Sequence, residues 1–130
     1  MKSIFLDFIQ DRSLSVWAST GWDSQFGGSY EALDASGTPL QELPKRTRVQ
    51  LRQIYTYSKA HAAGLYDAAQ IVDALYDFLS IDALSDPTNG CARLVQRDGK
   101  IIDKTRDLYD HAFLLLACAS SYEALGQPKH

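Results

Sequence analysis

The sequence predicts a mainly α protein in which helices are grouped with short β-hairpins. Several segments place apolar residues at helical spacing, and two glycine-rich hairpin signals recur along the chain. Gly28 and Gly37 are nine residues apart, as are Gly90 and Gly99, and the two pairs are offset by 62 residues. Each hairpin signal leads into a helix that is difficult to solvate. The predicted repeating unit is a hairpin, a buried helix and an amphipathic helix.

Two such units are fewer than repeat proteins usually need. A single repeat cannot cover its own apolar face, and at least three stacked repeats are usual. The chain, with 130 residues and 14.5 kDa, has the size of one domain, residues 1–130, with one hydrophobic core. Either the sequence is a piece of a larger ring or solenoid, or copies of the chain associate to complete one.

The first unit is preceded by a helix expected over residues 3–18, where apolar side chains recur at helical spacing. Next we expect a strand over 29–33 and a turn over 34–37. A helix over 44–62 follows, because Pro44 suits a first helical turn and Gly64 suits a helix stop.

The first unit ends with the clearest amphipathic pattern in the chain, which predicts a surface helix over residues 66–80, and the second unit begins after it. A hairpin follows, with strands over 91–96 and 100–103 and a turn over 97–99. The last helix is predicted to start near Thr105 or Asp107 and to end at Gly126, with Pro128 just beyond. Its middle is apolar on all sides, so we expect this helix to be buried.

Charge and composition exclude several classes of function. The net charge of −3 and the pI near 5.5 offer no basic surface for nucleic acid or an anionic membrane. The longest unbroken apolar stretch, 112–119, is far shorter than the roughly 20 residues that span a bilayer, and the N-terminus lacks a signal-peptide pattern. Cys91 and Cys118 are isolated, which predicts reduced thiols and a cytoplasmic protein. Because no ligand cluster shows metal spacing, neither a metal nor another cofactor is expected.

The predicted helix over 44–62 is unusually polar for its position. Helical spacing places two sets of side chains on adjoining sides: Arg48, Arg52, Tyr55 and Lys59 on one, and Arg46, Gln50, Gln53 and Tyr57 on the next. If this helix is equivalent to the buried last helix, its arginines face a polar cavity that a polyhydroxylated ligand could fill. Alternatively, Lys45 and Arg46 belong to a solvated basic turn, and Arg52 forms a structural ion pair with an aspartate.

Three segments together resemble the N-terminal part of the N-acylglucosamine 2-epimerase family of sugar epimerases and isomerases. They are GWDSQFGGSYEALDASGTPL, RVQLRQIYTYSKA, and DGKIID followed by DLYDHAFLLLACAS. The bacterial mannose isomerases are the more similar branch. The resemblance implies part of an (α/α)6 toroid, with 44–62 and 106–125 as inner helices beside a sugar cleft. Two units of about 60 residues would supply about a third of such a ring.

The resemblance also implies a function and a set of site residues. The family moves a proton at C2 of a sugar through an ene-diol. Arg52 corresponds to the arginine of the family's "RQ" pair, which contacts the sugar near its reacting carbonyl. Tyr109 corresponds to an aromatic residue that lines the sugar site, and Arg48 is a further substrate-binding candidate. His111 is either a ligand contact or a hydrogen-bonded structural residue.

The family's two catalytic histidines and a glutamate lie in a region with no counterpart in this sequence. We therefore expect a single copy of the chain to be inactive, although it retains residues that could bind a mannose, fructose or glucose type of sugar. The alternative is a non-catalytic relative that binds a sugar or self-associates, as a homo-oligomer, through its open repeat faces.

Overall fold

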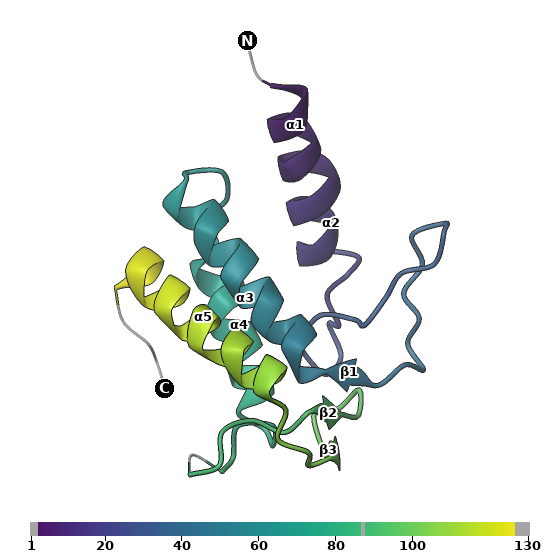
Figure 1. The fold of residues 1–130 in the computed structure, drawn as a ribbon. Helices are drawn as coiled ribbons and strands as arrows, with labels where there is room; N and C mark the ends of the chain where they lie inside the picture. The colour runs from purple at the N-terminus through teal and green to yellow at the C-terminus, as the bar shows by residue number, and fades with distance from the viewer. Residues whose placement is uncertain (1–2, 87, 127–130) are drawn as a thin grey trace.

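The structure is a computed structural model that describes residues 3–86 and 88–126. Its elements, in chain order, are α1 (Ile4–Asp7), the π-helical segment η1 (Phe8–Leu14), α2 (Ser15–Ala18), β1 (Lys45–Arg46), α3 (Thr47–Ala62), α4 (Ala69–Leu79), β2 (Leu94–Val95), β3 (Ile101–Asp103) and α5 (Leu108–Leu125). Helix α3 packs against both α4 and α5, and the small sheet lies near the first turns of α3 and α5 (Figure 1). The predicted mainly α chain with short β-structure is confirmed.

The predicted first helix is confirmed as a continuous helical run formed by α1, η1 and α2. The Ser3 hydroxyl caps it by accepting a hydrogen bond from Phe5 N at 3.3 Å. In its π-helical middle, both the backbone N–H and the hydroxyl of Ser15 donate to the carbonyl of Gln10, five residues earlier. Ile4 and Phe5 are 85% and 79% exposed, so one apolar side of this run is uncovered.

The loop between α2 and β1 contains the predicted turn but not the predicted strand over 29–33. Asp34 organises the turn, because its Oδ1 accepts hydrogen bonds from the backbone N–H groups of Ser36 and Thr38. Only isolated bridges flank it, one of them at Ser29. The side-chain amide of Gln50 accepts from Ser29 N and donates to Ser29 O, at 2.8 and 2.9 Å. The side chain of Gln50 thus makes the two backbone hydrogen bonds to Ser29 that a neighbouring strand would make.

Helix α3 starts later than predicted. Pro44 does not open the helix, because Lys45 and Arg46 form β1 and pair antiparallel with β2, which pairs with β3. The partners of this short strand lie about 50 residues away in the sequence, so local pattern gave no sign of it. The predicted end is confirmed: α3 stops at Ala62, and Gly64 has a φ of 70°.

The amphipathic helix and the second hairpin are confirmed with shorter bounds. Helix α4 buries Val72, Leu75 and Phe78 on one side. Strands β2 and β3 pair antiparallel, and Gln96 N donates to Lys100 O at 2.7 Å across the turn between them.

The bounds predicted for the last helix are close to those of α5, but its predicted burial is wrong. Asp107 caps the helix by accepting from Tyr109 N at 2.8 Å, and Gly126 ends it with a φ of 80°. Pro128 lies outside the described residues. Leu108 and Leu115 are 86% and 73% exposed, because α5 packs on α3 along one side only. Neither α5 nor any other helix in the described ranges is long and apolar enough to cross a membrane.

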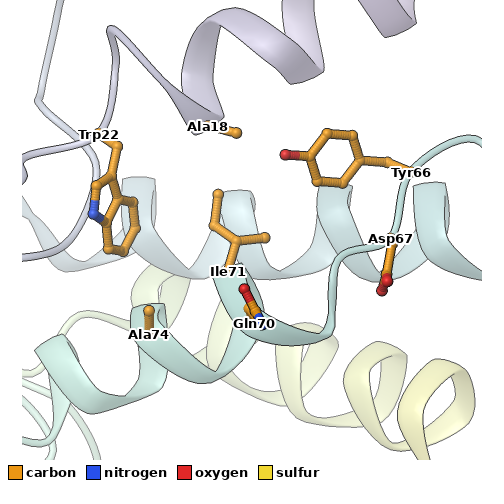
Figure 2. A pocket seen from close by; sticks show the side chains of 7 residues that line it. All are labelled: Ala18, Trp22, Tyr66, Asp67, Gln70, Ile71 and Ala74. Atoms are coloured by element: carbon orange, nitrogen blue, oxygen red, sulfur yellow. The ribbon is translucent and has the colours of Figure 1, made fainter.

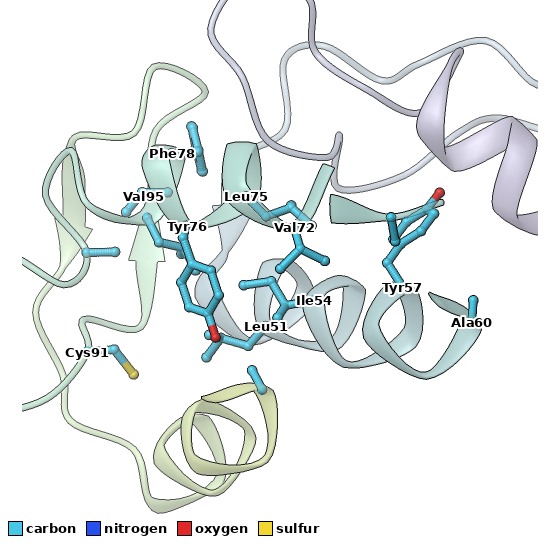
Figure 3. Packing of buried hydrophobic residues seen from close by; sticks show 14 of the residues in the cluster. Leu51, Ile54, Tyr57, Ala60, Val72, Leu75, Tyr76, Phe78, Cys91 and Val95 are labelled. Carbon is cyan, nitrogen blue, oxygen red and sulfur yellow. The ribbon is translucent and has the colours of Figure 1, made fainter. Parts of the chain in front are cut away.

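The core lies between α3 and α4 and extends to β2 and the segment before it (Figure 3). Its largest apolar members are fully or almost fully buried: Leu51, Ile54, Tyr57, Val72, Leu75, Phe78, Leu79 and Val95. Cys91 belongs to this core whereas Cys118 is exposed, and both are free thiols. Burial raises the pKa of Cys91 to about 11, which keeps this thiol protonated at neutral pH.

Candidate functional site

One side of α3 carries a row of cations that faces α5, as helical spacing predicts. Arg48 Nε lies 2.7 Å from Asp110 Oδ1, and Lys59 Nζ lies 3.2 Å from Glu123 Oε2. Between them, the guanidinium of Arg52 lies 5.5 Å from the ring centroid of Phe113. The row therefore lies along the packed edge between the two helices, and we call the surface formed by α3 and α5 here the α3–α5 face.

Arg52 is exposed on this face and borders a hollow of about 280 Å³. The hollow lies between α3 and the first helical run, and its lining is mixed polar and apolar: Ser13, Trp17, Val49, Arg52, Gln53 and Thr56. Among residues 3–86 and 88–126, no carboxylate forms an ion pair with Arg52. Its guanidinium can therefore bind a ligand without first breaking an internal salt bridge.

Tyr109 is on the first turn of α5. It lies beside Phe113 of the same helix and Arg48 of α3. The Arg48 guanidinium is 4.8 Å from the centroid of the Tyr109 ring. The Phe113 ring packs edge-on against it, with a centroid distance of 5.0 Å. Tyr109 is nevertheless 49% exposed, so part of its ring is accessible. The structure thus brings together three of the four predicted site residues, Arg48, Arg52 and Tyr109.

His111 is not part of this cluster. Its Nδ1 lies 2.8 Å from the carbonyl oxygen of Asp107, and its Nε2 accepts a hydrogen bond from Cys91 N at 3.3 Å. A Cβ on Gly90 would lie 2.0 Å from Nε2, so only glycine allows this close approach. The ring connects the start of α5 to the 89–91 segment through hydrogen bonds. This is the structural role that was one of the two alternatives for His111. A ligand contact by His111 stays a prediction.

Two residues assigned to the polar side of α3 are fully buried instead. Gln50 binds the backbone of Ser29, and the hydroxyl of Tyr57 donates to the carbonyl of Leu14 at 2.5 Å. Both side chains are 0% exposed. They fasten the N-terminal segments to α3, and the exposed polar surface of the helix is narrower than the sequence indicated.

The sequence interpretation missed Asp110, which is 0% exposed. Burial raises its pKa, and the Arg48 guanidinium opposes this rise. Arg48 also approaches Asp107, with an N–O distance of 3.5 Å. A carboxylate next to Tyr109, just before the apolar middle of α5, was the signal that could have indicated a buried partner for an arginine.

Lys45, for which a solvated basic turn was one interpretation, is fully buried. Its Nζ donates to Asp23 Oδ2 at 3.0 Å and to the carbonyls of Gly27 and Arg97 at 2.8 and 3.0 Å. Arg97 binds both oxygens of Asp23, at 2.7 and 3.1 Å. We call Lys45, Asp23 and Arg97 the buried ion cluster. Its donors are satisfied internally, which indicates a structural role.

A second hollow of about 270 Å³ lies between the end of α2, the loop after α3, and α4. Figure 2 shows the rings of Trp22 and Tyr66 on either side of it, with Ile71 between them. None of the predicted site residues lines this hollow, so it is separate from the α3–α5 face.

Helix pairs and short β-structure, with an exposed polar face on α3, define part of an α/α helical-repeat fold. The N-acylglucosamine 2-epimerase (GlcNAc 2-epimerase) family matches residues 27–130. This chain therefore belongs to that family, as the resemblance predicted.

The curated relatives carry three related names. The chain is 35% identical to a mannose-6-phosphate isomerase of Rhizobium meliloti (strain 1021), over 91% of this chain and 30% of that protein. It is 34% identical to a D-mannose isomerase of Thermobifida fusca, over 74% and 23% of the two chains. It is 26% identical to the human N-acylglucosamine 2-epimerase, over 92% and 29%. The chain thus spans less than a third of the length of these relatives.

Two solved structures of sugar epimerases resemble this chain over most of its length. The cellobiose 2-epimerase of Spirochaeta thermophila matches 96% of this chain with a TM-score of 0.82 and 26% identity, and the match covers 31% of that enzyme. A sugar epimerase from a ruminal bacterium matches 93% of this chain with a TM-score of 0.83 at 23% identity, which shows the fold alone. The chain is thus part of an (α/α)6 toroid, and the predicted fold class is confirmed.

Proposed function

We propose that this chain forms the sugar-contacting part of a mannose isomerase-like aldose–ketose isomerase or 2-epimerase, with the part of the α3–α5 face around Arg52 and Tyr109 lining the sugar cleft. The observation that carries the proposal is the position of Arg52. Its guanidinium is exposed on this face, rests on the ring of Phe113 and borders a hollow with further polar side chains. Family membership supplies the class of reaction.

The proposed chemistry is proton transfer at C2 through an ene-diol. Removing the proton next to a carbonyl places negative charge on the carbonyl oxygen, and a fixed cation stabilises that charge. Arg52 can fill this role but cannot act as the base, because a guanidinium stays protonated in proteins. The exposed ring of Tyr109 offers a surface for the sugar, and Arg48 supports that ring from behind. The base is proposed to come from outside these 130 residues, so one copy alone should bind sugar without converting it.

The test is the affinity of an Arg52→Met variant for D-mannose and D-fructose, titrated by NMR or calorimetry. Hydrogen bonds to charged groups contribute about 1.5–3 kcal/mol, so the loss of Arg52 should weaken binding by about tenfold or more. Lys59→Met is the matched control, because Lys59 lies in the same row and only its exposed pair with Glu123 is lost. Equal affinities for Arg52→Met and the wild type would contradict the assignment.

The second candidate function is self-association of a non-catalytic relative. The observation that favours it is the uncovered apolar surface on α1 and on α5, where Ile4, Phe5, Leu108 and Leu115 are all more than two-thirds exposed. Patches of this kind mark interaction surfaces. Light scattering on a sizing column tests it: a molar mass near three chains would support a ring closed by three copies, and a mass near one chain would contradict self-association.

A further inference from the structure

A continuous series of contacts joins a buried carboxylate to Arg52. Asp110 Oδ1 lies 2.7 Å from Arg48 Nε, and the Arg48 guanidinium lies 4.8 Å from the centroid of the Tyr109 ring. Tyr109 and Phe113 pack edge to face at 5.0 Å, and the guanidinium of Arg52 is 5.5 Å from the Phe113 centroid. We call these five side chains the cation–aromatic ladder.

The ladder has one buried end and one exposed end. Asp110 is 0% exposed, and within the described residues neither of its carboxylate oxygens accepts a hydrogen bond of normal geometry. Its ion-pair partner is Arg48, whose Nε lies 2.7 Å from Oδ1. Removing a buried carboxylate from its cation is costly, so Asp110 restrains Arg48 more strongly than an exposed partner could.

The constraint passes along the ladder because each step after the Asp110–Arg48 ion pair is a stacked or edge-on contact. A guanidinium over a ring is attracted by the ring's quadrupole, and an edge-to-face pair of rings has a preferred geometry. Arg48 is held in place and limits the positions open to Tyr109. Tyr109 in turn limits Phe113, on which Arg52 rests. Arg52 itself has no carboxylate partner among the described residues, and the ladder reaches its guanidinium through this stacking on Phe113.

We propose that Asp110 is a positioning residue of the sugar site, which orients Arg52 through the cation–aromatic ladder without touching the sugar. This inference rests on the proposed function, since it assigns a role to a residue behind the same site. It differs from a role in stability alone, because it requires that a change at Asp110 alters the environment of Arg52, four contacts away.

The first test needs no sugar. In NMR spectra of the wild-type chain, the ring of Phe113 should shift the side-chain proton signals of Arg52. Asp110→Asn keeps the shape of the side chain and removes its charge, so this ring-induced shift should decrease. Glu123→Gln is the matched control: it makes the same chemical change on the same helix, at an exposed ion pair with α3, and should leave the Arg52 signals unchanged. Unchanged Arg52 signals in Asp110→Asn would overturn the proposal.

The second test is the affinity for D-mannose. Coupling between residues of one interaction network corresponds to changes of about tenfold, so Asp110→Asn should weaken binding by about that factor while Glu123→Gln stays within about twofold. A folded Asp110→Asn variant with wild-type affinity would overturn the role in sugar binding. If the wild-type chain binds no sugar, the proposed function fails, and the role of Asp110 in orienting Arg52 is judged by the NMR signals alone.

A third variant covers the case in which Asp110→Asn does not fold. Arg48→Met combined with Asp110→Asn removes both charges of the buried pair, a change that proteins often tolerate. This double variant should also lose the ring-induced shift of Arg52, because the ladder is broken at the same step. Retention of the shift would overturn the proposal.

Discussion

Replacement of Asp23 by asparagine is expected to lower the free energy of unfolding by about 3–5 kcal/mol, the usual cost of removing one partner from a buried ion pair. Asp23 is 0% exposed and accepts hydrogen bonds from both Lys45 and Arg97. Without its carboxylate, Lys45 would be a buried cation close to a second cation. The loss is measured by urea unfolding at neutral pH.

Glu123→Gln serves as the control for this stability measurement as well, because its ion pair with Lys59 is exposed and should contribute less than about 1 kcal/mol. If Asp23→Asn and Glu123→Gln lowered the free energy of unfolding by similar amounts, the buried ion cluster would contribute no more to stability than an exposed ion pair.

The same variant should remove an acid-dependent part of the stability. Burial alone would raise the pKa of Asp23, but hydrogen bonds from Arg97 and Lys45 outweigh it and hold the pKa well below the usual range. Below about pH 4 the unfolded state therefore binds more protons than the folded state. The wild-type chain should lose stability as the pH falls below that value, and Asp23→Asn should lose less. Identical acid titrations of the two proteins would contradict this assignment.

Replacement of Gln50 by leucine is expected to lower the free energy of unfolding by about 3 kcal/mol. The amide of Gln50 satisfies both the N–H and the carbonyl of Ser29, at 2.8 and 2.9 Å, in the interior. Each buried backbone group left without a partner costs about 1–3 kcal/mol, and the greater apolarity of leucine offsets part of this. Thermal and urea unfolding would measure the loss.

Gln53→Leu is the matched control on the same helix, because Gln53 borders the open hollow beside Arg52. Its effect on stability should stay within about 0.5 kcal/mol, as for most surface substitutions. Equal free energies of unfolding for Gln50→Leu and Gln53→Leu would contradict this prediction. They would show that the hydrogen bonds between the Gln50 amide and the Ser29 backbone do not stabilise the loop before α3.

Periodicity and terminal residues predicted the helices well, because both act locally. The start of α5 lies at one of the two predicted positions, Asp107, and the ends of α5 and α3 followed from Gly126 and Gly64. The cation row of α3 was also predictable, since residues three or four apart share a side of any helix. Arg52 and Tyr109 became candidates through family resemblance, and the structure brings them to one face.

What the sequence by itself determined is therefore the set of helices, the turn residues and the family. The tertiary structure alone decided which polar side chains are buried and which helix face is covered. Lysine and glutamine are residue types usually found on the surface. Lys45 and Gln50 are buried nevertheless, and each binds a partner more than 20 residues away in the sequence. The apolar middle of α5 looks like core, yet only the side of α5 toward α3 and α4 is packed. Burial depends on which segments meet in space, and a linear pattern of residues does not contain that information.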